Sequence, residues 1–162
     1  MQGKAPTTNA MRMLTQAGIA FTTRTYEVDE DDLSGVHVAR QIGLDPDSVF
    51  KTLVAKGDKT GYLSCGIPVH RTVDLKKLAH VSGNKRVDLI PTRELLAVTG
   101  YVRGGCSPVG MKKKYPYYLD ETVILQLEVA ISAGVKGCQI VLGPEDLARA
   151  TEAHLCDILQ DE

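Results

Sequence analysis

Lys51 is the residue in this sequence whose surroundings point most directly to chemistry. It lies inside residues 49–55 (VFKTLVA), a run that otherwise predicts a buried strand. Side chains alternate across a strand, so Lys51 shares a face with Val49, Leu53 and Ala55, and an ammonium there is costly to bury without a partner. We expect an anionic or electron-rich ligand to meet it. The alternative is a gatekeeper lysine that faces solvent on an edge strand.

A glycine-rich segment is the second feature that suggests a binding site. Residues 104–110 read GGCSPVG, and three lysines follow at residues 112–114. Gly104 and Gly105 leave their backbone N–H groups open to a carbonyl or phosphate oxygen. Ser107 is either a nucleophile or, as its neighbours favour, a turn residue. The lysines either contact phosphate or form a solvated surface. The residues thus predict a small oxygen-rich ligand near Lys51 and Gly104.

Other catalytic patterns are missing from the sequence. There is no GxSxG motif, no CxxC and no HxxxH or HxE pairing. We therefore expect no metal and no cofactor, and reduced, mostly buried thiols. The thiols are Cys65, Cys106, Cys138 and Cys156.

Composition predicts one domain over residues 1–162. The chain is 43% hydrophobic and 24% charged, which is typical of a globular protein. No apolar run approaches the roughly 18 residues of a membrane span, and residues 1–6 precede no signal-peptide core, so we expect a cytoplasmic protein without a membrane partner. A net charge of −1 and the absence of tryptophan argue against tight, unaided binding to nucleic acid.

Apolar periodicity and turn residues predict a mixed α/β fold. Helices are expected through Met13 and Leu14, at 36–42, 74–79 and 91–97, and from Pro144 onward with His154 and Leu155 on the apolar side. Strands are expected at 19–26, 49–55, 62–68, 86–90, 122–129 and 138–142. Hairpin links between several strands favour a mixed sheet over a doubly wound parallel one.

From about residue 11 to residue 155 the sequence resembles the YbaK family of aminoacyl-tRNA deacylases. The resemblance rests on residues 25–27 (TYE), 49–53 (VFKTL), 73–79 (VDLKKLA), 99–110 (TGYVRGGCSPVG) and 132–137 (SAGVKG). It implies a barrel-like mixed β-sheet with peripheral helices. It also implies hydrolysis of mischarged aminoacyl-tRNA, with Cys-tRNA(Pro) as the substrate, in trans beside prolyl-tRNA synthetase. The alternatives are another mischarged tRNA such as Ala-tRNA(Pro), or a non-catalytic tRNA- or nucleotide-binding module. The oligomeric state, monomer or weak dimer, stays open.

The resemblance also implies roles for individual residues. Lys51 would contact the ester or the terminal adenosine, Gly104 and Gly105 would stabilise the oxyanion, and the substrate's own thiolate would be the nucleophile. Two positions depart from the family pattern: Ser34 replaces an aromatic residue and Gln139 replaces an acidic one, so the amino-acid specificity stays open. The expected substrate-binding residues are Tyr26, Thr52, Ser107, Pro108, Ser132 and Gln139.

Overall fold

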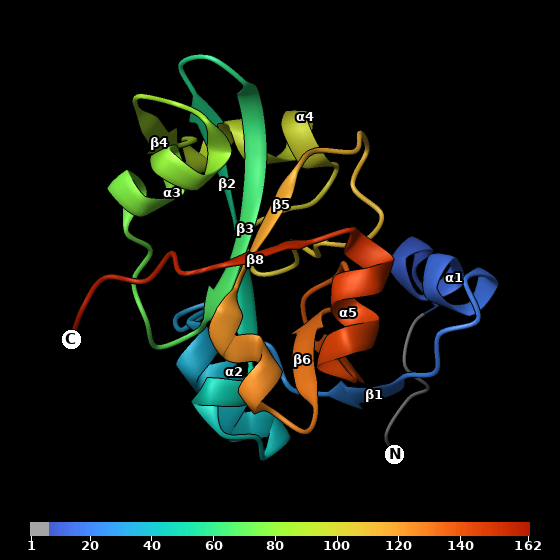
Figure 1. Ribbon diagram of the computed structural model, residues 1–162. Helices are drawn as coiled ribbons and strands as arrows, with labels where there is room; N and C mark the ends of the chain where they lie inside the picture. The colour runs from blue at the N-terminus through green and yellow to red at the C-terminus, as the bar shows by residue number, and fades with distance from the viewer. Residues whose placement is uncertain (1–6) are drawn as a thin grey trace.

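The computed structural model describes residues 7–162 as two β-sheets surrounded by helices (Figure 1). Residues 1–6, on which the signal-peptide argument rests, lie outside the described part. The larger sheet has the strand order β4-β2-β3-β5-β8. Its strands are β2 (Phe50–Gly57), β3 (Gly61–Pro68), β4 (Val87–Leu89), β5 (Tyr117–Asp120) and β8 (His154–Cys156).

Both strand orientations occur in the larger sheet. β2 pairs antiparallel with β3 and β4, whereas β3 pairs parallel with β5 and β5 parallel with β8. The β2–β3 turn needs Gly61 in the left-handed region, at φ 77°. The mixed sheet predicted from the hairpin-linked strands is therefore confirmed.

The smaller sheet is antiparallel and has the order β1-β7-β6. Its strands are β1 (Thr22–Thr25), β6 (Val129–Ser132) and β7 (Cys138–Leu142). An isolated parallel bridge between Val49 and Ala130 links the two sheets. The sheets meet at this seam but do not close into a barrel.

Five α-helices lie at the periphery of the described residues, 7–162, as expected. They are α1 (Asn9–Gln16), α2 (Gly35–Ile42), α3 (Leu75–Ser82), α4 (Leu95–Thr99) and α5 (Pro144–Thr151). Side chains of Thr8, Ser34 and Asp74 accept hydrogen bonds from the first turns of α1, α2 and α3. α2, α3 and α4 end at glycines in the left-handed conformation. None of the helices in residues 7–162 is long and apolar enough to cross a membrane.

The strand predicted at residues 122–129 is wrong, and a real strand before it was missed. Asp120 accepts hydrogen bonds from the Thr122 N–H (3.1 Å) and hydroxyl (2.6 Å), so the chain turns into a 3₁₀ helix at Glu121–Leu125. The strand of this region, β6, begins only at Val129. β5 lies just before the turn and pairs with β3.

The placement of His154 and Leu155 on the last helix is also wrong. α5 ends at Thr151, and Glu152 adopts φ 53°, a left-handed conformation that stops the helix. His154 then pairs with Tyr118 and Leu155 with Leu119 in strand β8. The last segment therefore extends the larger sheet.

The core divides into three clusters that hold the site's elements in place. One joins α1 and α5 to the smaller sheet through Leu14, Ile131, Ile140 and Leu147. A second packs α3 against β2 and β3. The third packs α2 against both sheets through Ala39, Ile42, Val49, Val69, Ala130 and Val141. α2 is thus fixed over the seam between the sheets.

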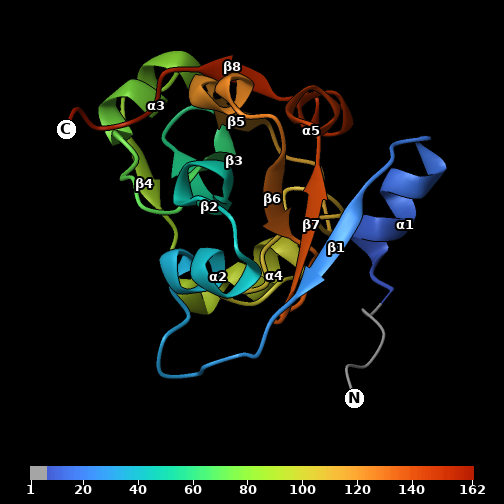
Figure 2. The same cartoon turned by 90° about the horizontal axis from the view of Figure 1, so that it is seen from below.

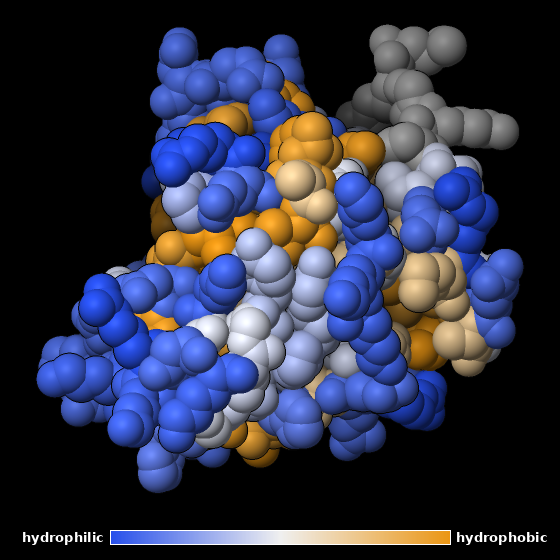
Figure 3. All heavy atoms as spheres, turned by 90° about the horizontal axis from the view of Figure 1, so that it is seen from above, coloured by the Kyte–Doolittle hydropathy of each residue, from blue (hydrophilic) through white to orange (hydrophobic). Residues whose placement is uncertain are grey.

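Helices α2 and α4 lie on the same side of the molecule (Figure 2). Figures 1 and 2 together place these helices at opposite ends of one side, with the long irregular segment after α4 running between them. Figure 3 views the molecule from the α4 end and shows a mostly hydrophilic face with an apolar area near its middle.

Candidate active site

A cavity of about 400 Å³ opens at the seam between the two sheets. Its wall comes from segments that are far apart in the sequence: the start of β2, the start of α2, the glycine loop (residues 104–110) with Arg103 before it, and the adjoining ends of β6 and β7. Tyr26, after β1, and Val69, after β3, complete the wall. Six of the nine expected site residues line it, namely Tyr26, Lys51, Thr52, Gly104, Ser132 and Gln139. The fold therefore brings Lys51 and Gly104 together, as their residue types predicted, and adds four residues that only the resemblance had connected with them.

Lys51 projects from β2 into this cavity wall. It is half-buried, and desolvation lowers the pKa of its ammonium below the ordinary value of 10.5. Among residues 7–162 no carboxylate forms an ion pair with Lys51 or contributes to its pKa shift, so no carboxylate compensates its burial. β4 pairs with β2 only at Ala55, Lys56 and Gly57, so it does not cover β2 at Lys51. The half-buried Lys51 side chain nevertheless lies in the cavity wall, whereas the gatekeeper alternative requires it to face bulk solvent. The ammonium is left available to an anionic or electron-rich ligand.

Gly104 and Gly105 differ in what their backbones can do. The Gly105 N–H donates to the Val102 carbonyl at 2.9 Å, and a Cβ at Gly105 would approach the backbone of Val135 and Lys136 to 3.2 Å. Its lack of a side chain is thus explained by packing between two loops, and its N–H is already used. Gly104 has φ 86° and lines the cavity, and its N–H has no acceptor among the described residues. Of the two expected oxyanion donors, the structure leaves only Gly104 available.

Ser107 and Pro108 also lie outside the cavity. Ser107 is fully buried, and its hydroxyl accepts a hydrogen bond from the Val109 N–H at 3.2 Å, which is the turn role that its neighbours favoured. Pro108 lines a different cavity on the far side of the loop. The glycine loop thus faces the main cavity with its first residues only.

Ser132 and Gln139 come from the paired ends of β6 and β7. The Ser132 hydroxyl accepts from the Gly134 N–H at 3.2 Å, which fixes the turn between the strands. Gln139 is only 6% exposed, and its Oε1 has no hydrogen-bond partner among residues 7–162. A buried, unpaired amide oxygen at a cavity wall is costly unless a ligand donates to it.

Tyr26 and Thr52 complete the expected set. Tyr26 continues the line of β1, with its N–H bonded to the Gly137 carbonyl at 2.9 Å. Close to Thr52 is the hydroxyl of Tyr117, which is buried and sits where a Cβ on Gly66 would be. Burial is the largest cause of the raised pKa of Tyr117, and the nearby Thr52 hydroxyl acts in the opposite direction. Thr52 therefore touches the cavity on one side and a neutral phenol on the other.

Several lining residues were not expected from the sequence. Arg103 carries a charge at the cavity mouth, and its position beside Gly104 is the signal that could have identified it. Cys106 lies in the same wall, and burial raises the pKa of its thiol to about 11. The remaining residues are contributed mainly by packing: Leu33, Ser34, Gly35, Val38, Val49, Phe50, Leu53 and Val69. Of these, only Ser34 had been singled out, as a departure from the family pattern. Val38, Val49, Phe50 and Val69 are ordinary core positions that no local pattern marks as part of a site.

The cavity is equipped to hold a polar ligand rather than to attack one. No histidine lines it, and a thiol with a pKa of about 11 is almost wholly protonated at neutral pH. Within residues 7–162 no group of three His, Cys, Asp or Glu side chains is placed to bind a metal ion. The cavity offers a cation, a backbone N–H and an amide acceptor. These groups suit an acyl ester that carries an ammonium.

Comparison with known proteins agrees with this description. Residues 34–150 match the family model described as aminoacyl-tRNA editing domain. An Enterococcus faecalis protein is 43% identical over 155 residues, covering 96% of this chain and 94% of its own. Its name, Cys-tRNA(Pro)/Cys-tRNA(Cys) deacylase EbsC, is itself provisional.

Solved structures show the same fold. One, described provisionally as a trans-editing enzyme for prolyl tRNA synthetase, has a TM-score of 0.82 at 22% identity and covers 96% of this chain and 100% of its own. A second, a hypothetical protein, has a TM-score of 0.83 at 19% identity over 92% and 97% of the two chains. The resemblance to YbaK proteins is confirmed: this chain belongs to the aminoacyl-tRNA editing domain family.

Proposed function

We propose that this protein hydrolyses the ester of mischarged aminoacyl-tRNA and that its substrate is Cys-tRNA(Pro). The observation that carries the proposal is the cavity itself. It combines an uncompensated half-buried ammonium, an available glycine N–H and a buried unpaired amide oxygen, and its one thiol is protonated. The Enterococcus relative, which bears the name of a Cys-tRNA deacylase, supports the choice of cysteine.

A substrate thiol supplies the nucleophile that the cavity lacks. The cysteinyl sulfur, as a thiolate, attacks the carbonyl carbon of its own ester and forms a four-membered cyclic thioester. The bond between that carbon and the ribose oxygen breaks, and the ribose oxygen takes up a proton. Water then opens the strained ring to give free cysteine. The protein's task is to fold the aminoacyl group into the geometry in which sulfur reaches carbon.

Each available group has a matching part of the substrate. Gly104 donates its N–H to the developing oxyanion. Lys51 lines the same cavity, and its ammonium stabilises either that negative charge or the charge on the leaving ribose oxygen. Gln139 accepts from the substrate's α-ammonium, which satisfies its buried Oε1. Tyr26, Thr52 and Ser132 shape the wall around the amino acid.

The protein acts on a substrate that another enzyme makes. A mischarged proline tRNA is a product of prolyl-tRNA synthetase, and we propose that this single domain meets the tRNA beside that enzyme. The low net charge of −1 favours such delivery over independent capture. The cytoplasmic location expected from the sequence stays a prediction.

The test is ester hydrolysis with proline tRNA charged with cysteine, alanine, serine or proline. We expect rapid loss of the cysteine ester only, because alanine and proline lack a nucleophile and the serine hydroxyl ionises far less readily than a thiol. Hydrolysis of the alanine ester at a similar rate would move the assignment to Ala-tRNA(Pro) and would exclude substrate assistance. Tight tRNA binding without loss of any ester would show a non-catalytic module.

A Cys106→Ala variant tests whether the nucleophile belongs to the protein. If the substrate's sulfur attacks, this variant should hydrolyse Cys-tRNA(Pro) within about twofold of the wild-type rate, since the Cys106 thiol is protonated. Complete inactivity of a folded Cys106→Ala protein would overturn the substrate-assisted mechanism.

A further inference from the structure

A second cavity, of about 170 Å³, lies on the other side of the glycine loop. Arg103, Gly104 and Cys106 face the main cavity, whereas residues 108–111 face the second one. Tyr117 lines the second cavity, and its hydroxyl approaches Thr52 of the first. The glycine loop and the Tyr117 side chain thus separate the two cavities. Nothing in the ester chemistry described above uses the second cavity.

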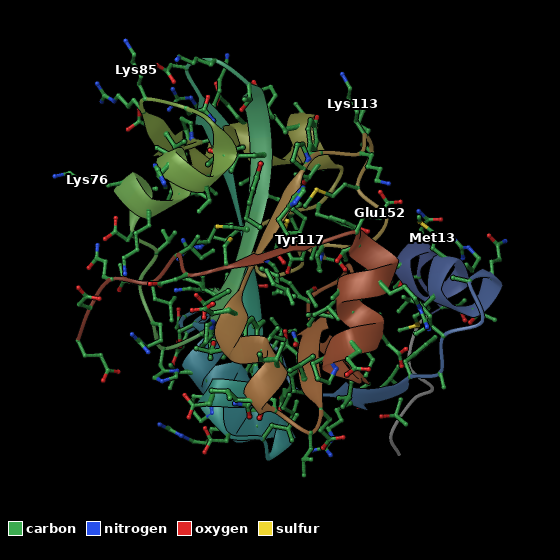
Figure 4. All side chains as sticks on the ribbon, viewed as in Figure 1. Met13, Lys76, Lys85, Lys113, Tyr117 and Glu152 are labelled. Carbon is green, nitrogen blue, oxygen red and sulfur yellow. The ribbon has the colours of Figure 1, made fainter. Side chains whose placement is uncertain are left out.

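The second cavity combines an apolar, partly aromatic floor with exposed ammonium groups. Its apolar residues include Met13 of α1 together with Val109 and Met111, and the ring of Tyr115 adds an aromatic surface. Lys113 and Lys114 stand at its rim. Figure 4 shows Lys113 projecting outward on the side of α1 and α5, with Met13 and Glu152 below it. Apolar and aromatic surface beside cations is the combination that binds single-stranded nucleic acid.

The two lysines are not equally available. Lys114 pairs with Glu152 at 2.8 Å, so much of its charge is compensated locally. Lys113 is exposed and has neither a hydrogen bond nor an ion pair among the described residues. Lys113 is therefore the group at this rim that can meet a phosphate at no cost to an existing contact.

Charge along the chain gives the direction from which a polyanion approaches. Residues 95–119 contain four basic residues and no acidic one, and they run from the main cavity to the second cavity. Residues 27–32, on the α2 side of the main cavity, contain five acidic residues and no basic one. A phosphate chain that enters over the acidic side is repelled, and one that enters over residues 103–114 is attracted.

We propose that the second cavity is a nucleotide subsite. It takes an unpaired nucleotide of the tRNA 3′ strand upstream of the esterified adenosine, with its phosphate on Lys113. The inference rests on the proposed function, which places the aminoacyl ester in the main cavity. The strand then crosses the glycine loop from one cavity to the other, so that the loop that holds the ester also sets the register of the RNA.

Two ester substrates separate this inference from the proposed function. The first is Cys-tRNA(Pro), and the second is 3′-cysteinyl adenosine, which has no upstream nucleotide. Lys113→Glu should lower kcat/KM for the tRNA at least about tenfold, leave the adenosine ester unaffected, and reduce the slope of log KM against log salt by about one. Lys85→Glu is the matched control: it changes the net charge equally, but it lies on the α3–β4 connection, on the opposite side of the molecule (Figure 4).

A second variant tests the cavity rather than the charge alone. Met13 is 46% exposed at the opposite rim, so the Met13→Glu protein should fold. It should also bind tRNA more weakly than wild type, as Lys113→Glu does. Affinity for uncharged tRNA is measured on the same four proteins and needs no catalysis. Equal behaviour of Lys113→Glu and Lys85→Glu in binding and turnover would overturn the subsite. So would a Met13→Glu protein that binds like wild type. Failure of wild-type protein to cleave either ester would instead reject the proposed function.

Discussion

At the scale of single residues, Lys51 affects stability and activity in opposite directions. Desolvation lowers its pKa, so the folded protein holds this proton less tightly than the unfolded chain does. Below the folded pKa the charged side chain lowers the free energy of unfolding. That penalty disappears as the pH rises from the folded pKa to the ordinary value of 10.5. A group that the fold disfavours and retains in a cavity wall is expected to serve a ligand.

We expect Lys51→Met to lower kcat/KM for Cys-tRNA(Pro) by about 100-fold or more, as loss of a transition-state charge contact does. The same variant should have a slightly higher Tm than wild type at pH 7, and the difference should shrink toward pH 10. Lys56→Met is the control, because Lys56 lies on the same strand but is exposed. A Lys51→Met protein that is less stable and fully active would return Lys51 to a structural role.

Gln139 can be tested in the same way through its unpaired oxygen. Gln139→Leu removes a buried acceptor with no protein partner, so the Tm should be unchanged or higher. Loss of a hydrogen bond to the α-ammonium should raise KM about tenfold or more. Gln126→Leu is the matched control: its Oε1 accepts from the Ser48 hydroxyl at 2.9 Å, so that change should cost stability and leave KM alone. An unchanged KM in Gln139→Leu would remove Gln139 from the substrate contacts.

At the scale of elements, the glycine loop acts through its backbone. Alanine at Gly104 must adopt φ 86°, which costs about 1–2 kcal/mol for a residue with a Cβ. Its Cβ would meet only the flexible Lys136 side chain, at 3.4 Å. The expected harm of Gly104→Ala is therefore a displaced N–H, rather than a methyl group pressed against the ester.

Gly104→Ala should accordingly lower kcat about tenfold or more while the protein stays folded. Gly83→Ala separates strain from function, because Gly83 has φ 80°, nothing lies within 4 Å of its Cβ position, and it ends α3 outside the cavity lining. Both variants should lose a similar amount of Tm, but only Gly104→Ala should lose turnover. Equal activity in the two would mean that the loop does not position the ester.

The sequence predicted most elements because their signals are local. Ser34 and Gly43 mark the two ends of α2, and Gly57 and Gly61 mark the β2–β3 turn. The misses arose where a side-chain cap or a left-handed backbone residue overrode the apolar pattern. Asp120 capped residues 121–125 into a 3₁₀ helix, and Glu152 stopped α5 before His154. Residues 122–129 have high β-propensity, but β-propensity takes no account of the hydrogen bonds by which Asp120 turns the chain into a 3₁₀ helix.

The candidate site was predictable only where a residue departs from its surroundings. A lysine in an apolar strand, as at Lys51, indicates a binding site, and so does the adjacent pair Gly104 and Gly105. Gly105 could not be told from Gly104, because which N–H is already bonded depends on how the loop folds. The unpaired oxygen of Gln139 depends on β6 and β7 pairing next to β2, which no local pattern encodes.

At the scale of the whole molecule, charge predicts how the protein finds its substrate. With a net charge of −1 it should bind Cys-tRNA(Pro) weakly alone at physiological salt. Addition of prolyl-tRNA synthetase should raise the rate of ester loss at low protein concentration, because the synthetase holds the tRNA nearby. Lysozyme or another unrelated protein at equal concentration is the control. Tight binding by the isolated protein, with no gain from the synthetase, would contradict delivery.

The pairing of β1 with β7 has a consequence for how the protein is made. Thr25 pairs with Cys138, so the smaller sheet joins segments separated by more than half the chain, and the cavity depends on that same pairing through Tyr26 and Gln139. Such distant pairings form slowly and late. A nascent chain can form α1, α2 and the β2–β3 hairpin early, yet it has no complete pocket until β7 has been synthesised. A growing polypeptide therefore presents no ester-cleaving site to the charged tRNAs that are building it.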